Sequence, residues 1–226
     1  MQTLLSMLTL QQQLNDNTNG KQWKEGFTKQ GKAINWKRCI YLESAELIES
    51  YPWKHWKNID APADFANIEI ELVDIWHFVL SELLRTHQGS LESLSQSLSS
   101  LPSFQTFCSL TPLENEAREP MVEIEAVESF LSQLFCAEEE NSLALAQGFF
   151  EMASTLQLSL DRLYQLYIGK NILNQFRQDH GYKEGSYIKE WNGKEDNVVM
   201  QSILAQQKNI SPDALYDALS TCYQAL

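Results

Sequence analysis

A long apolar segment, from Asn67 to His87, sets the strongest limit on how this chain can fold. The letters IEIELVDI alternate briefly as in a β-strand, but the segment continues to Leu84 without a breaker, and that length favours a helix. Apolar residues surround Glu71 and Asp74 on nearly every side, so burying the helix buries at least one acid. Because a buried carboxylate normally needs a partner, the segment predicts a helical core with a polar site inside it.

Helical periodicity dominates the rest of the chain too, and it predicts an all-α fold without strand pairs. Residues 17–35 are rich in glycine and polar groups and should form an irregular connection, while Pro52 should end the preceding helix. The Ser-rich stretch 89–103 keeps leucines at helical spacing and should form a surface helix. The other helices are expected at residues 2–16, 36–50, 67–87, 121–136, 142–178, 195–207 and 212–224, the last opened by Ser211 and Pro212.

Length and composition limit the class of protein. We expect one domain over residues 1–226, a compact multi-helix fold with a four-helix-type core, in which residues 88–141 carry fewer motifs. The formal net charge of −13 argues against a broad grip on nucleic acid or on an anionic membrane. Basic residues nevertheless concentrate in 21–57 and 162–194, which leaves room for a local anion site.

Cysteine usage and the N-terminal segment indicate the compartment. The four cysteines are scattered without a C-x-x-C pair, which is typical of a reduced, cytoplasmic protein. The first residues lack the basic region of a signal peptide. No apolar run approaches the ~20 residues that cross a bilayer, so we expect a soluble protein.

Two pairs of acids form the strongest chemical pattern. Glu43 and Glu46 are three residues apart on one predicted helix, and Glu71 and Asp74 are three apart on the next. Residues at this spacing share a helix face, and a short connection favours antiparallel neighbours, so the four carboxylates could meet across a cleft. Such a group needs cations to remain ionised, and Mg2+ suits oxygen ligands. Taken alone, Glu43 and Glu46 are better explained by an ordinary solvated helix face, and the second pair shifts the balance to a metal site.

A basic stripe forms the second pattern. Lys170, Asn174 and Arg177 follow helical spacing, and Lys183 lies in a glycine-flanked loop after them. Lysine and arginine suit phosphate oxygens, although a plain charged helix face would look the same. Together with a carboxylate metal site, the stripe would complete a grip on a polyphosphate.

Polar residues in two further stretches are weaker candidates. Gln12 and Asn15 offer donors and acceptors that could bind a pyrimidine edge, although on the sequence alone an ordinary glutamine-rich helix surface explains them better. His77 could be a metal ligand, a substrate contact or a hydrogen-bonded core group, and core packing explains Phe78.

The stretches LQQQLND, RCIYLESAELIESYPWKHWKN, IEIELVDIWHF and YIGKNILNQFRQDHGYKEGSYIKEWNGKEDN together resemble the dimeric, all-α dUTPases of the all-α NTP pyrophosphatase superfamily. The resemblance covers residues 8–80 and 163–198. It implies Mg2+-dependent cleavage of dUTP, and also of dUDP, to dUMP by a homodimer, with two or more Mg2+ per site and Mn2+ as a substitute. Such an activity would limit uracil incorporation into DNA and supply dUMP.

The resemblance also assigns roles to residues. Glu43, Glu46, Glu71 and Asp74 would hold the metal, with Glu43, or Glu46 in its place, activating water. The phosphates would contact Lys170, Asn174, Arg177 and Lys183, and the nucleoside would contact Gln12, Asn15, His77, Phe78 and Asn197.

Two other functions compete with this interpretation. One is a house-cleaning pyrophosphatase that acts on a different nucleotide. The other is a di-iron carboxylate bundle, which normally needs two Glu-x-x-His motifs; the chain has none, because the residue three before His77 is Asp74. A non-catalytic interaction bundle would leave the buried acids and the basic stripe unexplained.

Overall fold

In the computed structural model, residues 2–58, 61–136, 142–207 and 210–226 are described. They divide into two compact units, Met1–Leu163 and Tyr164–Leu226, and each unit is described by itself. Helices dominate both units, so the predicted all-α fold is confirmed. The expectation of one domain over residues 1–226 stays a prediction.

In the described part of the first unit, the regular structure is helical apart from one isolated β-bridge between Phe27 and Ala33. Its α-helices are α1 (Gln2–Asn19), α2 (Trp36–Glu49), α3 (Phe65–Thr86), α4 (Leu91–Ser99), α5 (Pro102–Cys108), α6 (Pro120–Cys136) and α7 (Ser142–Thr155). Two short 3-10 helices, η1 (Lys21–Glu25) and η2 (Asn115–Ala117), lie in the connections. Helix α8 (Leu160–Asp179) begins in this unit and continues into the second.

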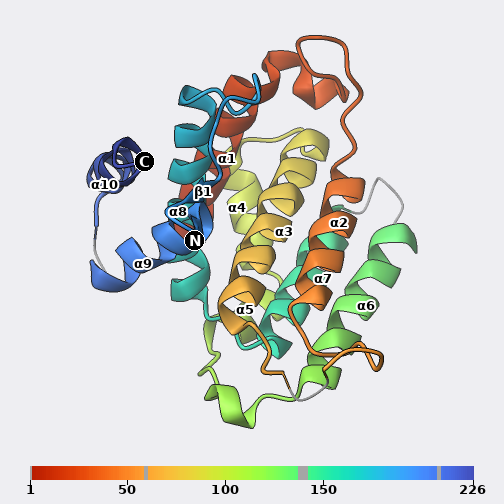
Figure 1. The fold of residues 1–226 in the computed structure, drawn as a ribbon. Helices are drawn as coiled ribbons and strands as arrows, with labels where there is room; N and C mark the ends of the chain where they lie inside the picture. The colour runs from red at the N-terminus through yellow and green to blue at the C-terminus, as the bar shows by residue number, and fades with distance from the viewer. Residues whose placement is uncertain (1, 59–60, 137–141, 208–209) are drawn as a thin grey trace. The chain divides into compact units, whose positions relative to one another are not determined.

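Helix α3 forms the centre of the first unit. It packs against α1, α2 and α7, which gives the predicted four-helix core. Its apolar residues are buried on nearly all sides, and Trp76 stacks on Phe149 with ring centroids 4.6 Å apart. Figure 1 shows α2 and α3 side by side and running in opposite directions. This arrangement brings Glu43 and Glu46 on α2 close to Glu71 on α3.

Side-chain caps fix where these two helices begin. The Asn35 side chain accepts a hydrogen bond from the Arg38 backbone N–H at 2.8 Å, and Asp64 accepts one from the Asn67 N–H at 3.0 Å. Each cap satisfies a backbone donor that the first turn leaves without a helical partner. Helix α2 ends at Glu49, shortly before Pro52, as predicted.

The prediction of one helix over residues 142–178 is wrong. Helix α7 ends at Thr155 and α8 starts at Leu160, because Gln157 adopts a left-handed conformation with φ 59°. The Gln157 side-chain amide donates to the carbonyl oxygens of Ser154 and Thr155 at the end of α7, and the Gln157 backbone N–H also donates to the Ser154 carbonyl. Neither glycine nor proline marks this break in the sequence.

Two smaller boundaries also differ from the predictions. Helix α1 continues one turn beyond Asp16, to Asn19. The Ser-rich stretch forms α4, whose Leu94 and Leu98 are buried, and a separate helix α5 starts at Pro102. Proline is well suited to the first turn of a helix because it needs no hydrogen-bond partner there.

The second unit contains the rest of α8, a small hairpin, α9 (Asp196–Gln206) and α10 (Pro212–Gln224). The hairpin pairs β1 (Glu190–Trp191) with β2 (Lys194–Glu195), which corrects the expectation that the chain has no strand pair. Asn192 and Gly193 close it with φ values of 51° and 79°, as a two-residue turn of this kind requires. Ser211 caps α10 as predicted, accepting from the Ala214 N–H at 3.2 Å.

An aromatic cluster forms the core of the second unit. Phe176 packs against His180, Trp191 and Tyr223, with ring centroids 3.9, 5.8 and 5.5 Å away. Tyr187 stacks almost parallel on Tyr223 at 5.4 Å. These rings fasten the loop after α8 and helix α10 to α8.

Candidate active site

Three glutamates converge where α2 meets α3. One carboxylate oxygen from each of Glu43, Glu46 and Glu71 lies within 4.8 Å of the other two. Glu43 and Glu46 share one face of α2 because they are three residues apart, and the antiparallel packing of α3 brings Glu71 opposite them. Glu71 is buried, Glu43 is half-buried and Glu46 is exposed, so the group opens towards solvent at Glu46.

The chemistry of this group fits a hard divalent cation. Three ionised carboxylates at this separation repel one another, and a bound cation with oxygen ligands would remove the repulsion. Asp74, the fourth predicted ligand, is half-buried one turn further along α3 and is not among the three converging acids. Its role as a ligand stays a prediction.

A cleft of about 540 Å³ adjoins two of these acids. Glu46 and Glu71 line one part of it, and the connection between α2 and α3 contributes Tyr51, Lys54 and Lys57. The cleft therefore combines carboxylates with ammonium groups. That mixture suits a ligand that brings both a metal ion and anionic phosphates.

Asn67 supports Glu71 from within α3. Its side-chain amide donates to Glu71 Oε1 at 3.2 Å and to the Ser50 hydroxyl at 2.9 Å. The residue thereby joins the end of α2 to a proposed metal ligand. Sequence analysis missed Asn67, although its position four residues before Glu71 on one helix could have indicated the contact.

Buried amides from α1 meet α3 at a second polar site. The Gln11 and Asn15 side-chain amides each donate to the Ser81 hydroxyl at 3.0 Å. The Gln11 carbonyl oxygen lies 2.6 Å from His77 Nδ1. All four side chains are buried. This network offers hydrogen-bond donors and acceptors in a setting where an unmatched group is costly.

The structure brings Gln11, and not Gln12, to this network. Gln12 is half-buried, and its side-chain oxygen accepts a hydrogen bond from Lys24 at 3.2 Å. The spacing could have indicated Gln11, because it continues the buried stripe of Leu4 and Leu8 towards Asn15. Ser81 was missed as well.

Aromatic rings lie close to the polar network on α3. Phe78 is half-buried and stacks on Trp36 with centroids 5.9 Å apart, so it is not only a core residue. Several candidate side chains of α3 thus lie on one stripe of the helix, at intervals of three or four residues: Asn67, Glu71, Asp74, Phe78 and Ser81.

The basic stripe lies in the second unit. There Arg177 contacts an acid, Asp196, that was not among the predicted site residues. Arg177 donates to both oxygens of the fully buried Asp196 at 2.8 Å, and to the Asn174 side chain at 3.2 Å. Lys170 donates to the Asn197 side-chain oxygen at 3.1 Å. Four of the predicted contacts therefore lie together: Lys170, Asn174, Arg177 and Asn197.

The surroundings of Asp196 fix its charge. Burial pushes the pKa of this carboxyl upward, but the hydrogen bonds and charge of Arg177, with the Tyr187 hydroxyl, hold the pKa below its ordinary value. Tyr187 donates to Asp196 at 2.8 Å, and burial and this bond raise the pKa of the phenol. Asp196 is thus an ionised partner that orients Arg177.

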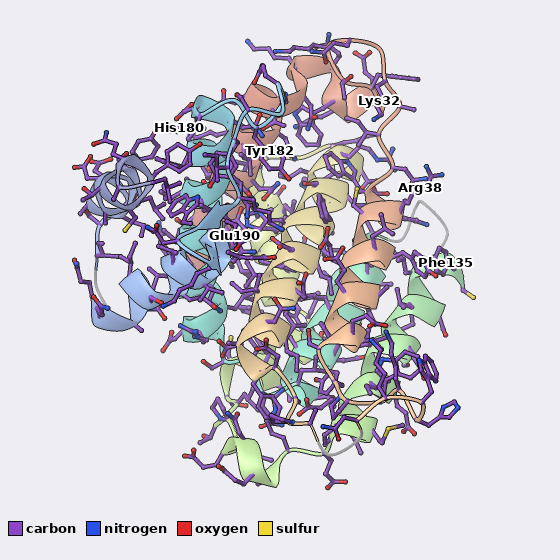
Figure 2. The ribbon with its side chains drawn as sticks, viewed as in Figure 1. Lys32, Arg38, Phe135, His180, Tyr182 and Glu190 are labelled. Carbon is purple, nitrogen blue, oxygen red and sulfur yellow. The ribbon has the colours of Figure 1, made fainter. Side chains whose placement is uncertain are left out.

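The third basic residue predicted to contact phosphate, Lys183, is exposed in the loop that follows α8. Figure 2 shows His180 and Tyr182 together at this end of α8. The Arg177 guanidinium carbon lies 5.8 Å from the centre of the Tyr182 ring. The loop thus continues the basic stripe beyond the helix.

The fold and the glutamate cluster define an all-helical protein with a carboxylate site suited to a divalent cation. A family model described as dUTPase matches residues 3–182, and the chain therefore belongs to the dUTPase family. Membership supports a dUTP diphosphatase activity, which is hydrolysis of a nucleoside triphosphate. No curated protein matches the chain. No helix in the described part is both long and apolar enough to cross a membrane.

Proposed function

We propose that the chain hydrolyses dUTP to dUMP and diphosphate, and dUDP to dUMP and phosphate, with Mg2+ bound by Glu43, Glu46 and Glu71 and by Asp74 beside them. The observation that carries this proposal is the convergence of three carboxylates, two of which line a cleft of about 540 Å³. Family membership names the substrate. More than one Mg2+ is expected per site, and Mn2+ should substitute.

The acidic residues have distinct tasks in this proposal. Glu43, Glu46 and Glu71 would hold Mg2+, whose chemistry would be to neutralise the charge that builds on the leaving group. Glu43 accepts the proton of the attacking water, with Glu46 as the alternative base. Glu71 is buried and held by Asn67, so its carboxylate is already oriented before a ligand arrives.

The polar network from α1 and α3 suits recognition of uracil. The base presents two carbonyl acceptors and one N–H donor, and the amides of Gln11 and Asn15 carry both kinds of complementary group. His77 and Ser81 orient these amides. Phe78, stacked on Trp36, provides an apolar face for the base or the sugar.

The basic cluster of the second unit binds the phosphate chain in this proposal. Lys170 and Arg177 supply the charge, Asn174 and Asn197 supply amides, and Lys183 adds an exposed cation. Arg177 already has its guanidinium plane fixed by Asp196, so little side-chain entropy is lost when a phosphate binds.

The composition of the cluster distinguishes this function from a di-iron protein. Among the residues that the structure describes, the converging ligand atoms come from three glutamates and from no histidine. The ring of His77 instead contacts Gln11. A homodimer in the cytoplasm, limiting uracil incorporation into DNA, is part of the proposal on the strength of family membership alone.

The test is diphosphate release from dUTP, dTTP, dCTP, dATP and UTP, with Mg2+ and with EDTA. Rapid release from dUTP alone, abolished by EDTA, is the expected result. Cleavage of another nucleotide would keep the metal site but discard the uracil pocket, and would leave a pyrophosphatase of other specificity. Absence of any cleavage by folded protein would contradict the proposal. Glu69→Gln, on α3 but outside the cluster, is the matched control for Glu71→Gln.

A further inference from the structure

The part of the chain with fewest motifs contributes a buried ion pair. Arg118, just before α6, donates to both carboxylate oxygens of Glu123, in the first turn of α6, at 2.7 and 2.8 Å. Their side chains are only 6% and 3% exposed. Taking two charges out of water costs free energy that their attraction often fails to recover. A buried pair of this kind therefore needs a reason beyond stability.

Contacts around the pair supply that reason. The Tyr51 hydroxyl donates to Glu123 Oε2 at 2.5 Å, and burial together with this bond raises the pKa of the phenol, so the proton stays in place. The Arg118 guanidinium carbon lies 4.1 Å from the centre of the Phe65 ring. Arg118 also donates to the Leu156 carbonyl at 3.0 Å. One ion pair thus holds the end of α2 and the start of α3.

Tyr51 and Phe65 bound the connection that lines the cleft. Tyr51 itself faces the cleft, as do Lys54, Lys57 and Asn58 after it. The connection continues through residues 61–64, of which Asp64 lines the cleft and caps α3. Fixing both ends of a short connection limits where its middle can lie. The opposite wall, with Glu46 and Glu71, stands on the two helices that the connection joins.

We propose that Arg118 and Glu123 are positioning residues for the active site, acting through Tyr51 and Phe65 on the cleft wall formed by residues 51–58. This proposal rests on the proposed function for its kinetic consequence, because the wall matters to turnover only if the cleft receives the nucleotide. Loss of the contact lets the wall move away from the carboxylates. Substrate affinity then falls while the glutamates that perform the chemistry stay in place.

Tyr51→Phe is the primary variant because it deletes one hydroxyl and leaves the Arg118–Glu123 pair intact. Loss of this hydrogen bond to a charged group should raise KM for dUTP about tenfold, while kcat stays within about twofold of the parent chain. Arg118→Lys keeps the charge but loses the two-pronged contact with Glu123 and the flat face over Phe65. It should raise KM in the same way. Arg162→Lys, in the Arg162–Glu69 pair on the first unit, is the matched control and should leave KM unchanged.

Tryptophan quenching gives a readout that needs no turnover. Of the six tryptophans, Trp53 and Trp56 on the cleft wall are 39% and 61% exposed, whereas the other four are at most 7% exposed. Acrylamide therefore reports mainly on the wall. Tyr51→Phe and Arg118→Lys should increase the quenching constant, and Arg162→Lys should not.

The outcomes separate the two proposals. Increased quenching in Tyr51→Phe and Arg118→Lys, together with a parent chain that does not cleave dUTP, would sustain the positioning role and overturn the proposed function. Unchanged KM and unchanged quenching in Tyr51→Phe would overturn the positioning role. Equal effects of Arg118→Lys and Arg162→Lys would also overturn it, since any Arg–Glu pair would then act alike.

Discussion

Arg177 and Asp196 form a two-pronged ion pair, with Nε and one terminal nitrogen each 2.8 Å from a carboxylate oxygen. Asp196 is fully buried, and Tyr187 donates to it as well. The pair joins α8 to the first residue of α9. The pair therefore orients Arg177 within the basic cluster, and it also holds α9 against α8 in the second unit.

Replacing Asp196 by Asn should remove the orienting charge beside Arg177. Breaking a buried pair leaves an unmatched guanidinium, and the free energy of unfolding should fall by about 3 kcal/mol. KM for dUTP should rise as well. Urea unfolding and steady-state kinetics on the same preparation measure both effects, and an unchanged unfolding midpoint would contradict the structural role.

The same carboxylate predicts a dependence of stability on pH. Its pKa in the folded chain lies below the ordinary value of 3.8, so the unfolded chain binds the proton more readily. The stabilisation is therefore complete well above pH 3.8 and is lost as the pH falls through the lowered folded-state pKa. As the pH is lowered from 6 to 2, the free energy of unfolding should fall more steeply in the parent chain than in Asp196→Asn. Parallel curves would mean that Asp196 does not titrate in this window.

Glu46→Gln and Glu71→Gln should each reduce turnover at least about 100-fold, because the proposed cation loses a ligand. Stability should hold or increase, since neutralising one member of a crowded group relieves repulsion. Diphosphate release across a Mg2+ titration, together with melting temperature, measures both. Asp74→Asn tests the fourth ligand, and near-normal activity would remove Asp74 from the site.

Asn67→Ala should weaken Mg2+ binding about 10-fold to 100-fold through loss of the bond that orients Glu71. Calorimetric titration with Mg2+ alone measures this without substrate. A variant that binds Mg2+ as the parent chain does would show that Glu71 needs no support from Asn67.

Gln11→Ala and Gln12→Ala form a matched pair on neighbouring positions of α1. Gln11→Ala should lower kcat/KM for dUTP relative to dCTP by about 10-fold or more, because a buried polar contact to the base is lost. Gln12→Ala should leave this ratio unchanged, since its side chain contacts Lys24 instead. The reverse result would return Gln12 to the base pocket.

The helices were predictable where local patterns determine them. Helix α3 follows from an apolar segment too long for a strand, and Ser211 with Pro212 marks the start of α10. The break at Gln157 was not predictable, because it depends on burying Leu156 and Leu158 and on a cap by the Gln157 side chain. Such a conformation is set by packing between elements and not by the local sequence.

The candidate site also contains some residues that local patterns could predict and others that they could not. Glu43, Glu46 and Glu71 were predictable because helix spacing and a short connection suffice to bring them together. The contact of Gln11 with Ser81 was not predicted, because the rotation of α1 depends on its packing against α3. Asp196 and Arg118 have their partners 19 and 5 residues away, outside any helical repeat. Their roles emerge only from tertiary structure.

The stripe of side chains on α3 sets the distance between the carboxylate group and the polar network. Glu71 belongs to the carboxylate group and Ser81 to the polar network, and ten residues of helix separate them by about 15 Å. A nucleoside with its phosphate chain is long enough to reach from the carboxylate group to the polar network. One residue inserted between them would rotate every later side chain by about 100° about the helix axis. Ser81 would then leave the polar network, while Glu71 would stay in the carboxylate group. Under the proposed function, the uninterrupted length of α3 between Glu71 and Ser81 would set the length of nucleotide that the chain accepts.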